Sequence, residues 1–144
     1  MIIHDIKFLG GRVHKRSLPT FPPPAPLELA EKRLLLPQGE LAQFYNGEEP
    51  VRYIAAIEFV KGTVRGNHYH QRKQEWVYLV TGAVQLVVED LRNNQRETVP
   101  MAAGDLAYIS PGIAHAFVVQ ENGMAVEYSP VRFDPTDNIR YSLT

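Results

Sequence analysis

Histidine and carboxylate side chains gather in one short stretch, GTVRGNHYHQRKQEWVYLVTG at residues 62–82. His68 and His70 are two positions apart, a spacing that puts both imidazoles on the same face of a β-strand. Glu75 follows after a short turn and begins a second strand. Apolar residues two and four positions after it point the same way, so the Glu75 carboxylate is predicted to face inward. Such a carboxylate needs a partner, because burying it alone is costly.

A third histidine, His115, lies in the segment GDLAYISPGIAHAF and is expected on another strand. His68, His70, Glu75 and His115 would together offer three imidazoles and one carboxylate. These donors suit one divalent transition metal such as Zn, Mn, Ni or Fe, and they leave positions open for water or substrate. The alternative is a hydrogen-bonded polar cluster inside the protein without a metal.

The spacing Gly62-x₅-His68-x-His70-x₄-Glu75-x₆-Gly82 resembles the first sequence motif of the cupin superfamily at each fixed position. This resemblance implies an all-β fold, the double-stranded β-helix or jelly-roll barrel. It also implies that the metal site lies inside the mouth of the barrel, a usual place for a small-ligand pocket.

The second cupin motif is matched in part, by Gly104, Gly112 and His115. Ser110 stands where the motif has a proline, and Val119 replaces its final asparagine. These departures affect a turn and a framework position, and they remove no ligand. The resemblance therefore implies His68, His70, Glu75 and His115 as the metal ligands.

A finer resemblance concerns RGNHYH at residues 65–70, which is similar to the RGxHxH stretch of cupins that act on nucleotide sugars. These include dTDP-4-keto-6-deoxyhexose 3,4-ketoisomerases, WxcM-like sugar enzymes and the cupin domain of a capsular polysaccharide reductase. The resemblance implies that Arg65 contacts an anionic group of a small-molecule substrate and that His68 or His70 is the catalytic base. A metal-bound histidine cannot also be a free base, so these two roles exclude each other.

The function implied is a metal-binding cupin that isomerises or epimerises a carbohydrate or nucleotide sugar. Two alternatives stay open at the level of sequence. One is an iron-dependent cupin dioxygenase, because the same donors with Fe(II) could activate O₂. The other is a non-catalytic cupin that binds a small molecule or a metal. The metal found in the purified protein would help to separate them.

The elements that must position these residues are short strands, because apolar runs alternate with turn signals at spacings of about 8–12 residues. The expected strands are residues 52–60, 75–80, 83–89, 97–99, 106–110, 114–120 and 124–129. Trp76 is expected to face away from the pocket, at a sheet or subunit interface. Residues 27–36, LELAEKRLLL, are interpreted as a short helix that ends before Pro37.

The first 26 residues differ from the rest, because they hold five prolines and more basic than acidic side chains. We assign residues 1–26 to an apolar strand and a proline-rich arm, and residues 27–144 to a single barrel domain. The run FPPPAP is predicted to be extended and polyproline-like. It could be a stiff linker or could cross to a neighbouring subunit, and cupins of this size commonly form homodimers, as the resemblance implies.

Composition excludes several classes of protein. The 144 residues carry a net charge of −1, so no basic surface favours nucleic acid. No apolar run approaches the ~20 residues of a membrane span, and the N-terminus has no signal-peptide pattern, so we expect a cytoplasmic protein without a membrane partner. The lack of cysteine excludes disulfides, thiolate ligands and cysteine nucleophiles.

Overall fold

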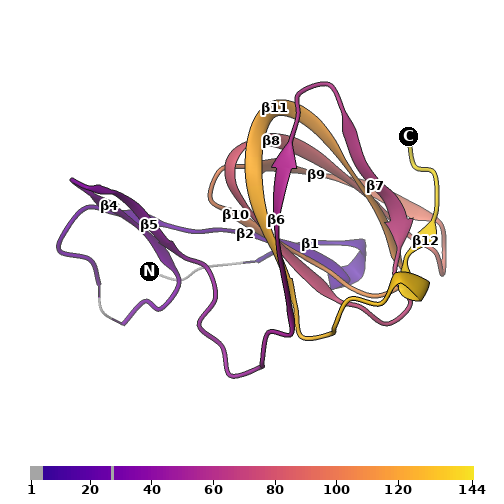
Figure 1. The fold of residues 1–144 in the computed structure, drawn as a ribbon, viewed down its shortest axis with the longest axis horizontal. Coiled ribbons are helices and arrows are strands. Elements are labelled where there is room, and N and C mark those ends of the chain that lie inside the picture. Colours follow the sequence, from indigo (N-terminus) through magenta and orange to yellow (C-terminus); the bar gives the residue numbers. More distant parts are fainter. Residues whose placement is uncertain (1–4, 27) are drawn as a thin grey trace.

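Strands dominate the computed structural model, which describes residues 5–26 and 28–144 (Figure 1). The strands are β1 (Ile6–Phe8), β2 (Val13–Ser17), β3 (Thr20–Phe21), β4 (Lys32–Leu36), β5 (Gly39–Gln43), β6 (Tyr53–Phe59), β7 (Val64–Tyr69), β8 (Glu75–Asp90), β9 (Gln95–Ala102), β10 (Asp105–Ile109), β11 (Ile113–Ser129) and β12 (Ile139–Arg140). Two single-turn 3₁₀ helices, η1 (Leu9–Gly11) and η2 (Pro135–Asp137), interrupt them. The predicted all-β fold is confirmed. Within the described ranges, no helix has the length and apolar character needed to cross a membrane.

Nine strands form the sheet of the barrel, in the order β1-β2-β10-β8-β11-β7-β12, with β6 paired to β11 and β9 paired to β8. β8 and β11 run antiparallel to each other and curve around the barrel (Figure 1). The sequence predicted two strands in place of each of them. They are continuous because Gly82, with a φ of +98°, bends β8 without ending it, and a register shift after Val119 accommodates the same bend in β11.

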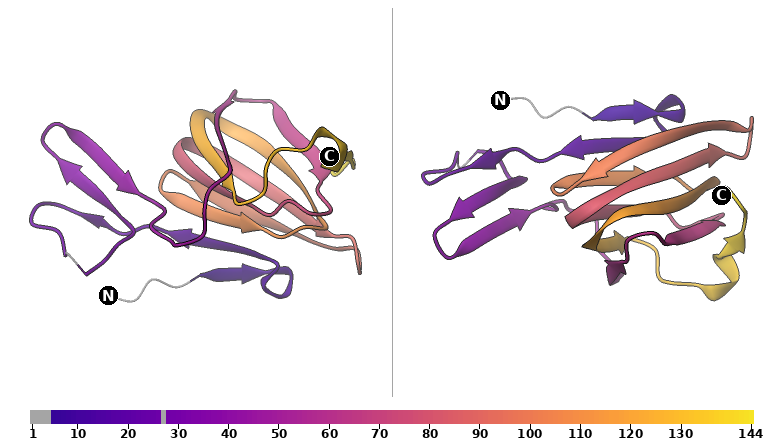
Figure 2. Two further views of the ribbon diagram at one scale, coloured as in Figure 1. Left: turned by 60° about the horizontal axis from the view of Figure 1, so that its bottom comes forward. Right: turned by 90° about the horizontal axis from the view of Figure 1, so that it is seen from above.

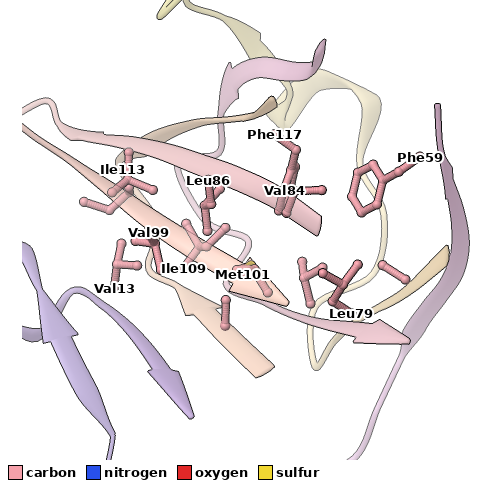
Figure 3. Close-up of a cluster of buried hydrophobic side chains, with 14 of the residues drawn as sticks. Val13, Phe59, Leu79, Val84, Leu86, Val99, Met101, Ile109, Ile113 and Phe117 are labelled. Atoms are coloured by element: carbon pink, nitrogen blue, oxygen red, sulfur yellow. The ribbon is translucent and has the colours of Figure 1, made fainter. Parts of the chain in front are cut away.

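The barrel interior is apolar and contains residues from most of its strands (Figure 3). Along the first half of β8, Val77 and Leu79 are buried in this interior, as the alternation predicted. Tyr78 points to the opposite face, where it stacks on Phe44 with ring centroids 4.4 Å apart. β8 therefore separates two packed layers, with Glu75 on the inner side.

A separate three-stranded sheet, β3-β4-β5, projects from the barrel (Figures 1 and 2). The prediction of a helix over residues 27–36 was wrong, because residues 32–36 form β4. Hydrogen bonds to a strand on each side outweigh the helix propensity of this segment, since β4 pairs antiparallel with β5 and parallel with β3. Residue 27 lies outside the described residues.

The N-terminal strand completes the barrel of its own chain. β1 pairs with β2, and β2 pairs along its whole length with β10. Residues 22–26 follow β3 and belong to no strand, and the proline-rich arm is not confirmed as a separate element. The segment before β1, residues 1–4, lies outside the described residues.

Candidate metal centre

Four side chains that are distant in sequence meet inside the barrel. His68 is on β7, His70 follows its end, Glu75 opens β8, and His115 lies near the start of β11. One donor atom from each of the four lies within 4.8 Å of the donor atoms of the other three. His70, Glu75 and His115 are buried, and His68 is half-buried. The structure thus brings together all four residues that the spacing singled out.

A backbone irregularity in β7 makes this meeting possible. His68 pairs with His115, but the next paired residue on β7 is Gly66, because the register shifts between His115 and Ala116. Gly66 has a φ of +108°, and a Cβ atom built there would lie 2.8 Å from the carbonyl oxygen of His115. Only glycine allows β7 and β11 to approach so closely at this point.

Backbone carbonyls orient two of the imidazoles. Nδ1 of His70 lies 2.6 Å from the carbonyl oxygen of Asp137, and Nδ1 of His115 lies 3.0 Å from that of Ile113. A carbonyl only accepts, so both Nδ1 atoms carry the proton and donate it. In a neutral ring, Nε2 is then left with a free lone pair directed at Glu75. Metal-ligating histidines are oriented in the same way.

The Glu75 carboxylate fits a bound cation better than a hydrogen-bond network. Its Oε1 lies 2.9 Å from Nε2 of His115 and 3.4 Å from Nε2 of His70. Even so, this buried oxygen has no partner with hydrogen-bond geometry in the described part of the chain. Lone pairs of three acceptors that face one another repel unless a proton or a metal ion lies between them. A transition metal would satisfy all three together with His68.

The electrostatics of the cluster hold its groups in the forms that a metal needs. Burial alone would raise the pKa of Glu75, but His115 and His70 outweigh it and keep the pKa well below its usual range. Burial lowers the pKa of His68 to about 4, and the other two imidazoles add to that shift. Burial would lower the pKa of His70, but the adjacent Glu75 carboxylate outweighs burial and raises it. Glu75 is therefore ionised and His68 neutral at pH 7.

Buried Lys73 and half-buried Glu127, beside the cluster, were missed by sequence reasoning. Nζ of Lys73 lies 2.5 Å from Oε1 of Glu127 and 3.9 Å from Oε2 of Glu75. It also lies 4.3 Å from the centre of the Tyr53 ring. Burial, reinforced by Glu75, raises the pKa of Glu127 to about 7. Glu127 is a charged residue on the inward face of an expected strand, which is a signal of the kind that identified Glu75. Lys73 lies in a turn and gave no signal.

Within the described residues, no hydrogen bond or ion pair joins Arg65 to the four donors. Arg65 is exposed, and its Nη2 donates to the carbonyl oxygen of Glu58 at 3.2 Å. It pairs across the sheet with Phe117, whose ring is part of the barrel core. Arg65 therefore lies on the same face of the sheet as Phe117, three residues before His68, and its guanidinium reaches the Glu58 carbonyl on β6.

The fold and the donors define a class, a jelly-roll barrel with a cluster of three histidines and one glutamate. Residues 55–129, more than half of the chain, match the family model described as Cupin domain. The chain belongs to the cupin family. No curated protein matches the chain at a significant level.

Solved structures share the fold at low sequence identity. dTDP-4-dehydrorhamnose 3,5-epimerase from Sulfolobus tokodaii is 17% identical over 99% of this chain and 84% of that chain, with a TM-score of 0.75. dTDP-6-deoxy-D-glucose-3,5-epimerase from Legionella pneumophila, in complex with dTDP-4-keto-L-rhamnose, is 15% identical over 95% and 76%, with a TM-score of 0.73. NovW, a 4-keto-6-deoxy sugar epimerase from Streptomyces spheroides, is 20% identical over 96% and 73%, with a TM-score of 0.72. At these identities the likeness concerns the fold.

Proposed function

We propose that this chain is a metal-binding cupin that isomerises or epimerises a keto sugar carried on a nucleotide. The observation that carries the proposal is the convergence of His68, His70, Glu75 and His115 within 4.8 Å, with two imidazoles oriented by backbone carbonyls. The sugar class is supported by the RGNHYH stretch and by the nucleotide-sugar epimerases with the same fold.

The chemistry needs a group that moves a proton, and a Lewis acid would assist it. A divalent transition metal held by the four donors would polarise a carbonyl group of the substrate. Three of the four donors are buried, and Glu75 is the single negatively charged ligand among them. Zn, Mn, Ni and Fe all suit three imidazoles and one carboxylate, so the donors alone do not select among them.

Glu127 and Lys73 are the charged side chains next to the four donors, and we propose that they contact the substrate there. Both lie next to Glu75, and their side chains form an ion pair at 2.5 Å.

If the site works without a metal, the base is His68 rather than His70. Both ring nitrogens of His70 face protein oxygens, whereas no hydrogen bond of the His68 ring is found within the described residues.

Arg65 is proposed as the contact to the anionic part of the substrate. It is exposed at the edge of the barrel, close in sequence to the ligand histidines, and its planar fork suits a phosphate group. The bond to the Glu58 carbonyl uses one of its five N–H groups, and no other hydrogen bond of this side chain is found among residues 5–26 and 28–144, so the rest of the fork can bind a phosphate.

Metal analysis tests the first half of the proposal. We expect tag-free protein, after incubation with each candidate metal and removal of the excess, to hold one metal ion per chain by elemental analysis. His70→Ala should reduce this occupancy, whereas the matched variant His14→Ala, on the outer face of the sheet, should not. Sub-stoichiometric metal that loading does not restore would contradict the metal site. Iron in the protein as purified would favour the dioxygenase.

Hydrogen exchange tests the second half. Isomerisation or epimerisation beside a ketone removes a proton from the neighbouring carbon and returns one from solvent. We expect dTDP-4-keto-6-deoxyglucose, incubated with metal-loaded protein in D₂O, to lose the corresponding proton signals in its NMR spectrum. Metal-loaded protein that exchanges no proton of this substrate or its UDP counterpart would overturn the carbohydrate assignment and leave the metal site standing.

A further inference from the structure

A row of aromatic rings crosses the outer face of the barrel sheet, on the side opposite the metal cluster. His14 on β2, Tyr108 on β10, Trp76 on β8 and Tyr128 on β11 are direct cross-strand neighbours. Their ring centroids are 4.8, 4.7 and 5.8 Å apart in that order, and Tyr45 continues the row 5.4 Å beyond Tyr128. Trp76 thus faces away from the metal cluster, as the alternation in β8 predicted.

These rings form the floor of a cavity of about 170 Å³ with a charged rim. Arg16 is the centre of the rim, because its Nε donates to Oδ1 of Asp5 at 2.9 Å and its Nη1 donates to Oε1 of Glu31 at 2.6 Å. Asp5 precedes β1 and Glu31 precedes β4, so the rim joins three segments around the edge of the aromatic floor. His14 also approaches Asp5, at 3.5 Å.

The charges of this cavity disfavour an anionic ligand. Its charged groups are two carboxylates and one guanidinium, since burial lowers the pKa of His14 and outweighs the opposing effect of Asp5. The ring is therefore neutral at pH 7, and the cavity carries a net negative charge. This negative charge would repel a phosphate group or a nucleotide.

The same groups also disfavour a small organic cation. Aromatic rings with carboxylates attract quaternary ammonium groups, but here Arg16 already forms an ion pair with each of the two carboxylates. A cationic ligand would have to compete with that guanidinium. A hydroxyl group would not, because each carboxylate can accept further hydrogen bonds while it keeps its bond to Arg16.

We propose that this cavity is a binding site for a neutral pyranose ring, separate from the metal centre. The flat apolar face of the ring would lie on Trp76 and its neighbours, and the hydroxyl groups at its edge would bond to Asp5, Glu31 and Arg16. Tyrosine and tryptophan suit such a ligand because they combine a large apolar surface with a polar tip. The site lies on the opposite face of β8 from Glu75, so it does not depend on the proposed metal chemistry.

Trp76 is the sole tryptophan of the chain and lines this cavity, so its fluorescence reports on binding there. We expect methyl α-L-rhamnopyranoside or methyl β-D-glucopyranoside to change the emission in a saturable way. Sorbitol, which has hydroxyl groups but no ring, should not. Saturation by choline or thymidine monophosphate in place of the pyranosides would overturn the proposal, and so would no saturation by any of them.

Variants of the rim locate the binding. Glu31→Ala should weaken pyranoside binding by about tenfold or more, the loss expected for a hydrogen bond to a charged group. Glu31→Gln keeps one acceptor and should recover part of it. Phe133→Ala removes an exposed aromatic ring outside the cavity and should leave the titration unchanged, with circular dichroism confirming the fold of each variant. Equal binding by wild type and Glu31→Ala would overturn the assignment.

Two further measurements distinguish a pyranose site from an effect of the metal centre and from a subunit interface. His115→Ala should lose the metal but bind the pyranoside with unchanged affinity, so a failure of the metal site does not affect this test. If the emission instead follows protein concentration in step with dimer formation and no pyranoside competes, the face is an interface between two copies of the chain and the proposal is wrong.

Discussion

Asp137 holds His70 and the turn that follows it in one place. Its carbonyl oxygen lies 2.6 Å from Nδ1 of His70, while its carboxylate accepts the backbone N–H groups of Gln71, Arg72 and Lys73 at 2.7–3.1 Å. This turn is the connection between His70 and Glu75. The segment η2 near the C-terminus therefore fixes the distance between two ligands that lie in the middle of the chain.

Asp137→Ala is predicted to loosen the metal centre without removing a ligand. Three backbone N–H groups of the turn would lose their acceptor, so we expect a loss of stability of about 1–3 kcal/mol and weaker metal binding. Asp137→Asn keeps one acceptor, the amide oxygen, so its stability and its metal affinity should lie between those of the wild type and of Asp137→Ala. The measurements are thermal unfolding and metal competition with a chromophoric chelator. Glu40→Ala, which removes a surface carboxylate bound to Arg33, is the matched control; equal effects of both variants would contradict a specific role for Asp137.

Gly66→Ala is predicted to damage both the fold and the site. The new Cβ atom would lie 2.8 Å from the carbonyl oxygen of His115, at a φ that alanine rarely adopts. Positions of this kind cost about 1–3 kcal/mol, and the displaced β11 strand would carry His115 away from the other ligands. Gly62→Ala is the control, because it has a φ of +84° and open space around its Cβ position. Similar metal affinity in the two alanine variants would show that the close approach of β7 and β11 is not required.

Most of the barrel could be predicted from sequence because its strands alternate in hydrophobicity and end at glycine or polar turns. The shared face of His68 and His70 and the inward direction of Glu75 followed from the same alternation, since a face of a strand is fixed by odd or even position, whereas His115 was singled out by its spacing from Gly104 and Gly112. Continuous β8 and β11 were not predicted, because the sequence of a bend and that of a turn look alike when both contain glycine.

Features that depend on distant partners could not be predicted. Residues 32–36 carry a local helix pattern, and only the neighbouring strands β3 and β5 make them a strand. Lys73 gave no signal because a turn has no inner and outer face until the rest of the barrel is in place. The hydrogen bonds between Asp137 and the turn join residues more than sixty positions apart, and no periodic pattern in the sequence indicates them.

Asp90 is predicted to make the stability of the barrel depend on pH in acid. Hydrogen bonds from Arg92 contribute most to lowering its pKa to about 2; burial opposes them, and Arg12 adds to the lowering. In the unfolded chain the pKa is about 3.8, so the stabilisation is complete above that value and is lost as pH falls from about 4 to 2. Asp90→Asn should therefore destabilise the protein by about 1–3 kcal/mol at pH 7 and by little at pH 2. Urea unfolding at a series of pH values measures this difference, and a gap that stays constant down to pH 2 would contradict the assignment.

The projecting β4–β5 hairpin leads us to predict a homodimer. Leu35 and Leu41 on this hairpin are 46% and 49% exposed, and the hairpin projects from one side of the barrel (Figure 2). Light scattering at about 50 μM should give the mass of two chains, since a stable dimer dissociates only below micromolar concentration. Leu41→Lys should shift the protein toward monomer, whereas Val60→Lys, an exposed apolar residue beyond the end of β6, should not. A monomeric wild type at this concentration would contradict the prediction.

Removal of the Arg65 guanidinium should weaken substrate binding without changing the metal centre. Arg65 is exposed, and its one side-chain hydrogen bond in the described part of the chain goes to the Glu58 carbonyl, so Arg65→Ala is expected to fold normally and keep its full metal content. Loss of a charge-assisted contact to a phosphate group costs about 1.5–3 kcal/mol, or about 10- to 150-fold in affinity for a nucleotide sugar. Arg65→Lys should recover only part of it, because an ammonium group cannot make the bidentate contact. Calorimetry with dTDP- and UDP-sugars gives the affinities, and Arg52→Ala is the control, since that arginine is exposed and bonded to the carbonyl of Pro130. Unchanged affinity in Arg65→Ala, together with weaker binding by Arg52→Ala, would show that Arg52, and not Arg65, contacts the anionic group of the substrate.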